Sequence, residues 1–329
     1  MASNTYDQEN LGSAVSTKEQ KFAGASLISP AEHPLYSSLN KVSLKSTTQS
    51  WFLDDYAAPR IDPVAEGVNP STYEDGNEFI GEVFNYTHTL ERTGQITDDF
   101  ALTDSYVDTS LARVKQKKST EIFRDIEKLC FDETARATGS KGGVARRTEG
   151  IAGQLTVTSS VFSDAPEYLI PTAQVINATA PTETTVNNAL KSVADKSGSM
   201  ADLMVYADSG WMHEFTKNVL RVDAATEADK LRVNIDGNSA TVNLRLKVYD
   251  GISGKITLAM TNPLCSNDST NLDTALFLNR KNVKIGHLGA NISINDEPVR
   301  HGTREFSIRT KVMPMVTNPL SCVNWRSTT

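Results

Sequence analysis

Apolar residues recur at helical spacing through a charged stretch of the chain, and this pattern predicts one long helix over residues 103–136. The recurring positions are Val107, Leu111, Val114, Ile122, Ile126 and Leu129. Thr103 or Asp104 would cap the start of the helix, and Gly139 lies just beyond its end. At a rise of about 1.5 Å per residue the helix would span roughly 50 Å, wider than a small domain. We therefore expect a strut across an elongated molecule.

A long extended hairpin is predicted immediately before this helix, over residues 48–100. Trp51, Phe52 and Leu53 open the first side of the hairpin. On the returning side apolar and polar residues alternate with the period of a strand, the apolar positions being Ile80, Phe84, Tyr86 and Leu90. Proline and glycine indicate an irregular tip between the two sides, at Pro63, Gly67, Pro70 and Gly76.

The hairpin carries a large excess of acidic residues over its two arginines, Arg60 and Arg92. The acids are Asp54, Asp55, Asp62, Glu66, Glu74, Asp75, Glu78, Glu82, Glu91, Asp98 and Asp99. An isolated two-stranded hairpin is only marginally stable in water, and like charges weaken it further. We therefore expect this hairpin to lie on a cationic surface.

Such a surface is available on the predicted helix and the loop that follows it. Its cations are Arg113, Lys115, Lys117, Lys118, Arg124, Lys128, Arg136, Lys141, Arg146 and Arg147. Either these residues receive an acidic hairpin, or they form an ordinary solvated face balanced by Glu121, Asp125, Glu127, Asp132 and Glu133. The helix charges alone leave both interpretations open.

Residues 151–289 show a mixed pattern of helices and strands. Helices are predicted at 182–193 and 211–220, strands at 203–206 and 275–278, and a hairpin that turns at Asp250-Gly251 after the alternating Val242, Leu244, Leu246 and Val248. A final alternating segment follows at 306–325, where Pro314 and Pro319 suit strand edges or ends. The predicted fold class is α+β.

The first 46 or so residues are rich in Ser, Thr, Asn and Gln, and alone they could not offset the entropy of ordering.

The 329-residue chain is lean in core residues, with 39 % hydrophobic and 7 % aromatic residues. A net charge of −7 argues against a dedicated nucleic-acid binder, although one local basic patch could still meet nucleic acid. Three widely spaced cysteines suit a reducing cytosol. The sequence shows neither a signal peptide nor an apolar run long enough to span a membrane, so we expect a protein that is cytosolic and soluble at synthesis.

Local motifs for catalysis, metal binding or cofactor binding are missing or fail in context. Asp195, Ser197 and Ser199 match a D-x-S-x-S metal motif, but they follow a helical run, so the end of a helix is the better interpretation. The glycines at 139, 142 and 143 do not match a phosphate loop and follow a helix where a strand is required. We therefore expect no catalytic, metal or cofactor site.

Several motifs occur in a recognisable order along the chain. They are S-W-F-L-D-D-Y-A-A-P at 50–59, Glu66-Gly67, Arg92-Thr93-Gly94, I-F-R-D-I-E at 122–127, R-T-E-G-I at 147–151 and K-V-M-P-M-V-T-N-P at 311–319. Together with the order of the predicted elements, they resemble the major capsid protein of tailed bacteriophages, which has the Hong Kong 97 fold. The resemblance covers most of the chain from Ser50 onward.

This resemblance implies an N-terminal arm at 1–47, an extended loop at 48–100, a peripheral domain with a spine helix at 101–150 and 290–329, and an axial domain at 151–289. It implies hexamers and pentamers that close into an icosahedral shell around double-stranded DNA, with scaffold and portal partners and an optional decoration (cement) protein. The protein would assemble in the host cytoplasm and reside in the virion, without a membrane partner. Some relatives cross-link a loop lysine to an asparagine, but this chain has no lysine between Lys45 and Lys115, so that chemistry is not expected and Asn324 is not assigned to it.

Candidate intersubunit contacts follow from the hairpin and the helix. They are Trp51, Phe52, Asp54, Asp55, Glu74, Asp75, Phe84, Tyr86, Arg92, Arg113, Lys117 and Arg124. Aromatic side chains bury large areas and often dominate interfaces, but these could instead pack within their own chain. Lys141, Arg146 and Arg147 would face either packaged DNA or an acidic loop of a neighbour.

A second hypothesis is a cytosolic α/β enzyme or ligand-binding protein whose site assembles from scattered residues. The lean core, the extended hairpin and the missing catalytic motifs count against it. The two hypotheses differ in the particle that each predicts. A capsid protein forms shells, capsomers or sheets, whereas an enzyme of this kind remains a compact monomer or dimer across salt and protein concentration.

Overall fold

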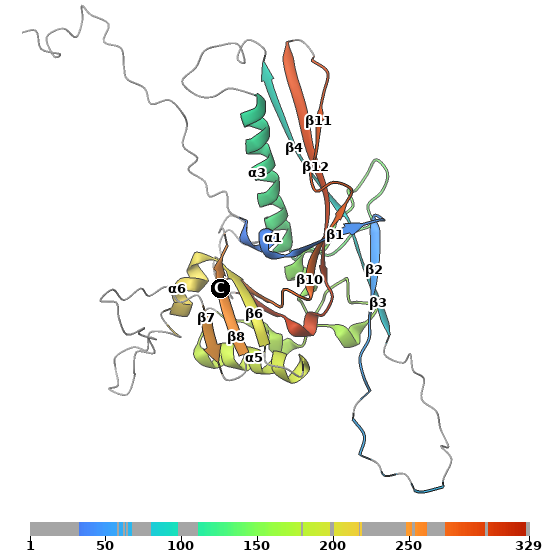
Figure 1. Ribbon diagram of the computed structural model, residues 1–329, viewed down its shortest axis with the longest axis vertical. Helices are drawn as coiled ribbons and strands as arrows, with labels where there is room; N and C mark the ends of the chain where they lie inside the picture. The colour runs from blue at the N-terminus through green and yellow to red at the C-terminus, as the bar shows by residue number, and fades with distance from the viewer. Residues whose placement is uncertain are drawn as a thin grey trace, which may run out of the picture.

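The computed structural model describes most of the chain after the N-terminal arm. The described residues are 33–57, 59–61, 63, 65–67, 80–97, 111–178, 180–197, 201–216, 218, 248–251, 254–261, 274–299 and 302–326. They form two larger β-sheets, a separate pair of strands and a long helix, arranged as an elongated molecule (Figure 1).

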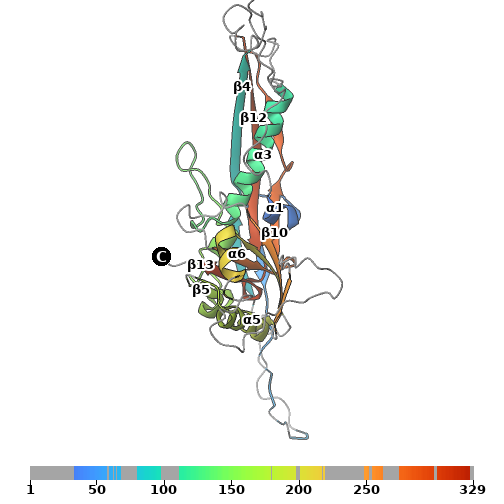
Figure 2. The same ribbon diagram turned by 90° about the vertical axis from the view of Figure 1, so that its left-hand side faces the viewer.

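The first sheet is built around the long strand β12 (Thr303–Val316). One side of β12 pairs antiparallel with β4 (His88–Thr97), and the other pairs antiparallel with β11 (Ser293–Asp296) and β10 (Val283–Leu288). The short strand β1 (Asn40–Leu44) adds to β10 in parallel. Helix α3 (Leu111–Cys130) lies along β4 and β12, as Figure 2 shows, and buries Ile122 and Ile126 against them.

Helix α3 is shorter than predicted, because it ends at Cys130 and not at Arg136. Its predicted start at Thr103 or Asp104 lies outside the described residues. Three consecutive residues, Leu129, Cys130 and Phe131, are buried, so the chain turns into the core where a surface helix would keep one face in water. The returning chain also blocks the helix axis, since a side chain at Gly150 would meet the carbonyl oxygens of Leu129 and Asp132. The described part of the helix, Leu111–Cys130, is about 30 Å long.

The second sheet has six strands in the order β5 (Val175–Asn177), β13 (Val323–Arg326), β9 (Ala275–Leu278), β6 (Ala201–Ala207), β8 (Gly254–Met260) and β7 (Val248–Gly251). Helices α5 (Glu183–Ser197) and α6 (Ser209–Phe215) pack against it. Its core is aromatic, with Trp211 close to Phe215, Phe277 and Trp325. Asp208 caps α6 by accepting a hydrogen bond from the Trp211 amide.

Most elements predicted in this half are confirmed. The strands at 203–206 and 275–278 correspond to β6 and β9. The predicted hairpin is formed by β7 and β8, with Asp250 and Gly251 as the last paired residues of β7, whereas Val242, Leu244 and Leu246 lie outside the described residues. The helix at 182–193 corresponds to α5 and that at 211–220 to α6, which the structure begins at Ser209. Asp195 and Ser197 lie on α5, as expected for the end of a helix, whereas Ser199 lies outside the described residues.

Strand pairing crosses the predicted domain boundaries at three places. Strand β4, from the predicted extended loop, pairs with β12 over ten positions. Strand β10, from the predicted axial range, belongs to the first sheet, and the C-terminal strand β13 belongs to the second. Each of these pairings gives hydrogen-bond partners to backbone N–H and C=O groups that would lack them if the strands paired only within their predicted domains. The exchanges of β10 and β13 tie the two sheets together, and that of β4 ties the predicted extended loop to the first sheet.

Pro314 lies inside β12 and not at its end. Its carbonyl oxygen accepts hydrogen bonds from the side chains of Asn85 and Gln154, on the side of β12 that β4 no longer covers. In a strand the nitrogen of a residue points to the same side as its carbonyl oxygen, so the missing N–H costs no ladder hydrogen bond. Pro314 therefore lies at a local edge of the sheet, on the side where β4 has already ended, and in this sense it agrees with the prediction.

Short helical segments complete the described chain. They are α1 (Pro34–Ser38), α4 (Ile151–Gln154), and the 3₁₀ turns η1 (Pro166–Tyr168), η2 (Thr172–Gln174) and η5 (Pro319–Ser321). Among the described residues, no helix is long and apolar enough to cross a membrane. In the same part of the chain, no cluster of His, Cys, Asp and Glu has the arrangement of a metal site.

Candidate intersubunit interface

A two-stranded hairpin forms the root of the predicted extended loop. Strand β2 (Thr48–Leu53) pairs antiparallel with β3 (Gly81–Tyr86), and Val83 and Leu53 are buried against the body. Of the predicted tip, Pro63 and Gly67 are described and exposed, whereas Pro70 and Gly76 lie in residues 68–79, outside the described residues. The hairpin predicted from the sequence is therefore confirmed at its root.

Beyond Leu53 the chain leads away from both sheets (Figure 1), and every described residue between 54 and 67 is exposed. Two large apolar side chains in this segment are almost fully exposed to solvent: Tyr56 is 96 % exposed and Ile61 is 95 % exposed. Phe52, the second-last paired residue of β2, is 66 % exposed. Apolar surface gathered on a projecting segment is typical of a site that another protein covers.

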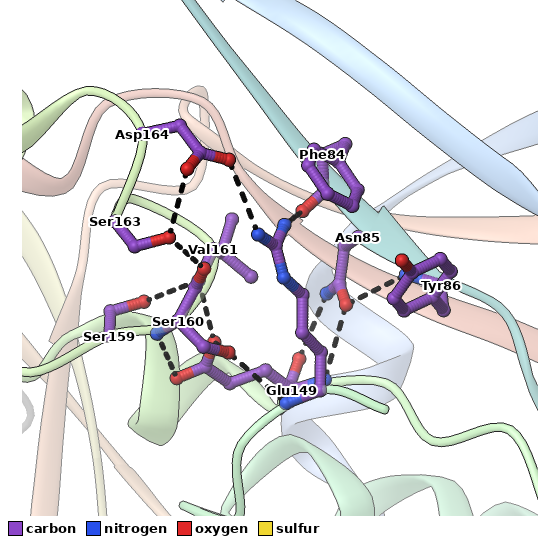
Figure 3. Close-up of polar contacts among 10 residues, drawn as sticks. Phe84, Asn85, Tyr86, Glu149, Ser159, Ser160, Val161, Ser163 and Asp164 are labelled. Atoms are coloured by element: carbon purple, nitrogen blue, oxygen red, sulfur yellow. Dashed lines mark hydrogen bonds and ion pairs between the residues drawn. The ribbon is translucent and has the colours of Figure 1, made fainter. Parts of the chain in front are cut away.

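The hairpin root is held by a buried amide, Asn85 (Figure 3). Its side-chain nitrogen donates to the carbonyl oxygens of Glu149 (3.1 Å) and Pro314 (3.2 Å), and its side-chain oxygen accepts from the Glu149 amide (3.2 Å). The side chain thus binds the backbone of one residue as a neighbouring strand would. Three bonds in a dry site fix the position of β3 relative to the body.

The side chain of Glu149 continues this network on the opposite side (Figure 3). Its buried carboxylate accepts hydrogen bonds from the Ser160 hydroxyl (2.7 Å), the Ser160 amide (3.3 Å) and the Val161 amide (2.9 Å). Burial raises the pKa of this carboxyl group above its ordinary value, and the hydrogen bonds from Ser160 and Val161 oppose that rise. Asn85 and the 160–161 turn are therefore linked through one residue.

Arg136 covers the outer face of the hairpin root. Its guanidinium lies 3.6 Å from the centre of the Phe84 ring, donates to the Phe84 carbonyl oxygen, and lies 3.5 Å from a carboxylate oxygen of Asp164. The Phe84 ring in turn meets Tyr86 edge to face, with centroids 5.6 Å apart. On the other end of β3, Gly81 allows a close approach, since a Cβ there would lie 2.8 Å from that of Ala165. The direction in which the hairpin leaves the body is set by these contacts.

The predicted aromatic contacts separate into two groups. Trp51, Phe84 and Tyr86 are half-buried and have partners within their own chain. Phe52 remains largely exposed. Among the predicted acids, Asp54 and Asp55 are exposed on the projecting segment, and Glu74 and Asp75 lie outside the described residues.

The predicted cations of the helix are largely engaged within the chain. Arg92 on β4 binds both carboxylate oxygens of Asp125 on α3, each at 2.6 Å, and Arg113 and Arg124 also have interactions inside the chain. Helix residues Lys115 and Lys118 pair with Asp296 and Glu121. Lys117 is exposed.

The glycine-rich basic stretch forms a tight exposed loop closed by the bridge between Ala137 and Arg147. Gly139 and Gly142 have positive φ angles of 71° and 74°, which explains the glycines without a phosphate-binding role. Lys141 is exposed on this loop, and Arg146 is half-buried. Arg147 pairs with Asp132 at 2.6 Å, at the end of α3. The structure therefore spreads the three predicted basic residues over different environments.

Sequence reasoning missed Asn85, Glu149 and Arg136 as the residues that hold the hairpin. For Asn85 the sequence pattern was misleading, because it gave the apolar side of the strand to Phe84 and Tyr86, whereas the structure buries the side with Gly81, Val83 and Asn85. A polar residue at such a position needs buried partners. Glu149 and Arg136 left no local signal, since their partners lie far away in the sequence.

A family model described as the SU10 major capsid protein matches residues 4–303 of this chain. The chain belongs to this family. The predicted family is therefore confirmed, and this is a major capsid protein with the α+β fold of phage capsids.

Solved structures with the same fold include phage capsids and a related particle. A capsid of a native GTA particle matches with 12 % identity, coverage of 100 % of both chains and a TM-score of 0.59. Mycobacterium phage Adephagia matches with 10 % identity, coverage of 99 % of both chains and a TM-score of 0.59. The capsid of cyanophage P-SCSP1u matches with 12 % identity, coverage of 94 % of this capsid protein and 93 % of that chain, and a TM-score of 0.55. No curated protein sequence matches the chain significantly.

Proposed function

We propose that this capsid protein assembles into hexamers and pentamers that close into an icosahedral shell around double-stranded DNA. The observation that carries the proposal is the projecting segment 54–67. Its apolar side chains are exposed to solvent, and the hairpin root from which it extends is held to the body. A single chain that exposes Tyr56 and Ile61 almost completely gains by covering them with another copy. The family to which the chain belongs supports the same role.

We propose that each predicted domain of the chain has its own role in the shell. Residues 1–47 serve as an arm, 48–100 as the loop that reaches a neighbour, 101–150 with 290–329 as the peripheral domain, and 151–289 as the axial domain. The exchanges of β10 and β13 between the predicted peripheral and axial ranges support treating these two parts as one connected body. The hairpin is then the part left over for contact between copies.

The proposed shell is held by non-covalent contacts and performs no catalysis. The projecting loop has no lysine to form an isopeptide bond. Asn324 is buried, and its side chain donates to the carbonyl oxygens of Ala152 (3.2 Å) and Leu155 (3.1 Å), which supports a structural role. Exposed ion pairs contribute only about 0–1 kcal/mol each, so apolar burial has to supply most of the interface energy.

We also propose scaffold and portal partners during assembly in the host cytoplasm, with an optional decoration protein in the finished virion. Packaged DNA would meet the inner face without sequence specificity. Lys141 and Arg146 on the 138–146 loop are candidates for that contact or for contact with an acidic neighbouring loop.

Substitution of Phe52 tests the proposed role of the projecting segment. Phe52→Ser is expected to raise the protein concentration needed for assembly by about tenfold or more, because burying one large apolar side chain is worth about 1.5–3 kcal/mol. Sedimentation velocity and negative-stain electron microscopy measure the assembled fraction. The side chain is exposed in one chain, so unfolding in urea should change little.

Met260→Ser provides the matched control, since Met260 is 62 % exposed at the end of β8, in the second sheet. The proposal predicts that this variant assembles much more readily than Phe52→Ser. Equal assembly of Phe52→Ser and the unaltered protein would contradict the role of the loop. A compact monomer or dimer at every salt and protein concentration would contradict the shell itself.

A further inference from the structure

A short segment at the start of the described chain bridges the two sheets. We call residues 33–44 the latch; it contains α1 and β1. Figures 1 and 2 show α1 beside the lower end of α3 and β1 running onto the first sheet. The latch buries Leu35, Tyr36 and Leu39 in the main core. It lies within the predicted N-terminal arm (1–47), so its attachment determines where the arm joins the body.

The latch is held at one end by Glu127, a fully buried carboxylate on α3. Glu127 accepts hydrogen bonds from the amides of Leu35 (3.0 Å) and Tyr36 (2.8 Å), in the first turn of α1. Amides in the first turn of a helix have no partner within the helix, and the positive end of the helix dipole favours a carboxylate there. A helix of five residues cannot form alone, so α1 depends on this contact and on its buried side chains.

Other contacts connect the latch to both sheets. The Tyr36 hydroxyl lies 3.3 Å from Nε2 of His287 on β10, and its ring packs against Phe123 on α3. The Ser38 hydroxyl contacts that of Tyr206 on β6, and Arg280 donates to the Ser38 carbonyl oxygen at 3.0 Å. The latch therefore touches α3, the first sheet and the second sheet together.

The carboxylate of Glu127 has no ion-pair partner among the described residues. The titratable and charged groups around the latch come from every adjoining element: Tyr36 and Lys41 on the latch, His33 before α1, Cys130 on α3, His287 on β10, Tyr206 on β6, and Arg280. Burial raises the pKa of Glu127 from 4.5 to about 6, and the two amide hydrogen bonds only partly oppose that rise.

We propose that the latch, including β1, detaches from the body while the other strands of both sheets stay paired, and that the protonation state of Glu127 sets how tightly it is held. Detachment admits water to Glu127, so its carboxyl group regains an ordinary pKa. Since the pKa is higher in the attached state, protonation favours attachment. That contribution is fully present below about pH 4.5 and is lost as the pH rises through about 6. The difference between 4.5 and 6 corresponds to up to about a 30-fold change in the attachment equilibrium.

His287 acts in the opposite direction. Burial and the nearby Lys41 lower its pKa, so the attached latch favours the neutral ring and acid weakens that contact. The pH dependence of the unaltered protein is therefore a sum of opposing contributions. Only a comparison with a Glu127 variant isolates the carboxyl group.

Hydrogen exchange of the full chain, followed by mass spectrometry between pH 4 and pH 8, tests the proposal. Protection of the amides in residues 33–44 is corrected for intrinsic exchange rates and compared between the unaltered protein and Glu127→Gln. Glutamine keeps a carbonyl acceptor but carries no charge. As the pH rises, the unaltered latch should lose up to about 30-fold more protection than the variant latch. Parallel pH profiles would overturn the proposal.

Two controls keep the result interpretable. Glu121→Gln alters a half-buried acid on the same helix, paired with Lys118, and should leave the latch profile unchanged. In the unaltered protein alone, residues 33–44 should exchange faster than β6 and β10. If the latch exchanged only together with those strands, it would not detach as a unit and the proposal would fail, even if Glu127→Gln did not fold. These results concern one chain, so they stand or fall separately from shell assembly.

Discussion

At the scale of single residues, the body of this capsid protein is fixed by buried polar side chains that bind backbone groups. Asn85 and Gln154 both donate to the Pro314 carbonyl oxygen, and Asn324 donates to the carbonyl oxygens of Ala152 in α4 and of Leu155 just after it. Each of these amides replaces a strand that would otherwise have to pair with the exposed backbone. Such contacts specify one arrangement, since a shifted chain would leave them unpaired in a dry site.

Removal of the Asn85 side chain should destabilise the body strongly. Asn85→Ala leaves the Glu149 amide without its acceptor and removes one donor from each of the carbonyl oxygens of Glu149 and Pro314, so we expect the free energy of unfolding to fall by about 2–4 kcal/mol. Urea unfolding followed by circular dichroism measures the change. Asn295→Ala on the exposed strand β11 is the control and should alter stability by less than about 0.5 kcal/mol. A similar small effect for both variants would show that Asn85 does not hold the root.

At the scale of elements, the hairpin and α3 depend on charge differently. The cations of α3 are mostly paired within the chain, so the helix offers little free charge to a neighbour. The acids of the projecting segment, Asp54 and Asp55, are exposed. The attraction between an acidic loop and a cationic surface is therefore expected to guide docking more than to hold the shell.

Neutralising acids of the loop tests this expectation. Replacing Asp54, Asp55, Glu74 and Asp75 by Asn or Gln should slow assembly at low salt while the second sheet stays folded. The difference from the unaltered protein should shrink as salt is added, because screening removes the attraction. Light scattering records the rate at several salt concentrations.

A matched pair of variants separates position from total charge. Asp54→Asn with Asp55→Asn removes two charges from the loop, and Asp195→Asn with Asp202→Asn removes two exposed charges from the second half. Only the first pair should slow assembly. Equal rates for the two pairs at low and high salt would disprove electrostatic docking by the loop.

At the scale of the whole molecule, local patterns in the sequence predicted elements better than connections. The hairpin root, β6, β9 and the β7–β8 hairpin follow directly from alternation and turn residues. The end of α3 was wrong because Gly139 suggested a stop, whereas burial of Phe131 ends the helix earlier. The pairing of β1 with β10 and of β13 with β9 joins segments far apart in sequence, and no periodicity encodes such partners.

The candidate interface was predictable in part for the same reason. Phe52 and the acids stand out in the sequence, and the structure leaves Phe52, Asp54 and Asp55 exposed. Trp51, Phe84 and Tyr86 look alike in sequence, but their own chain half-buries them. Which aromatic residue is available to a neighbour depends on three-dimensional contacts such as that of Arg136 with Phe84.

A cryo-electron microscopy reconstruction of the assembled particle, at a resolution that shows side chains, would measure where residues 52–67 lie. Our account predicts that Phe52, Tyr56 and Ile61, all exposed in the single chain, are buried against a second copy related by the symmetry of the shell. The account would be contradicted if the assembled particle left these three side chains in solvent or folded them back onto their own chain.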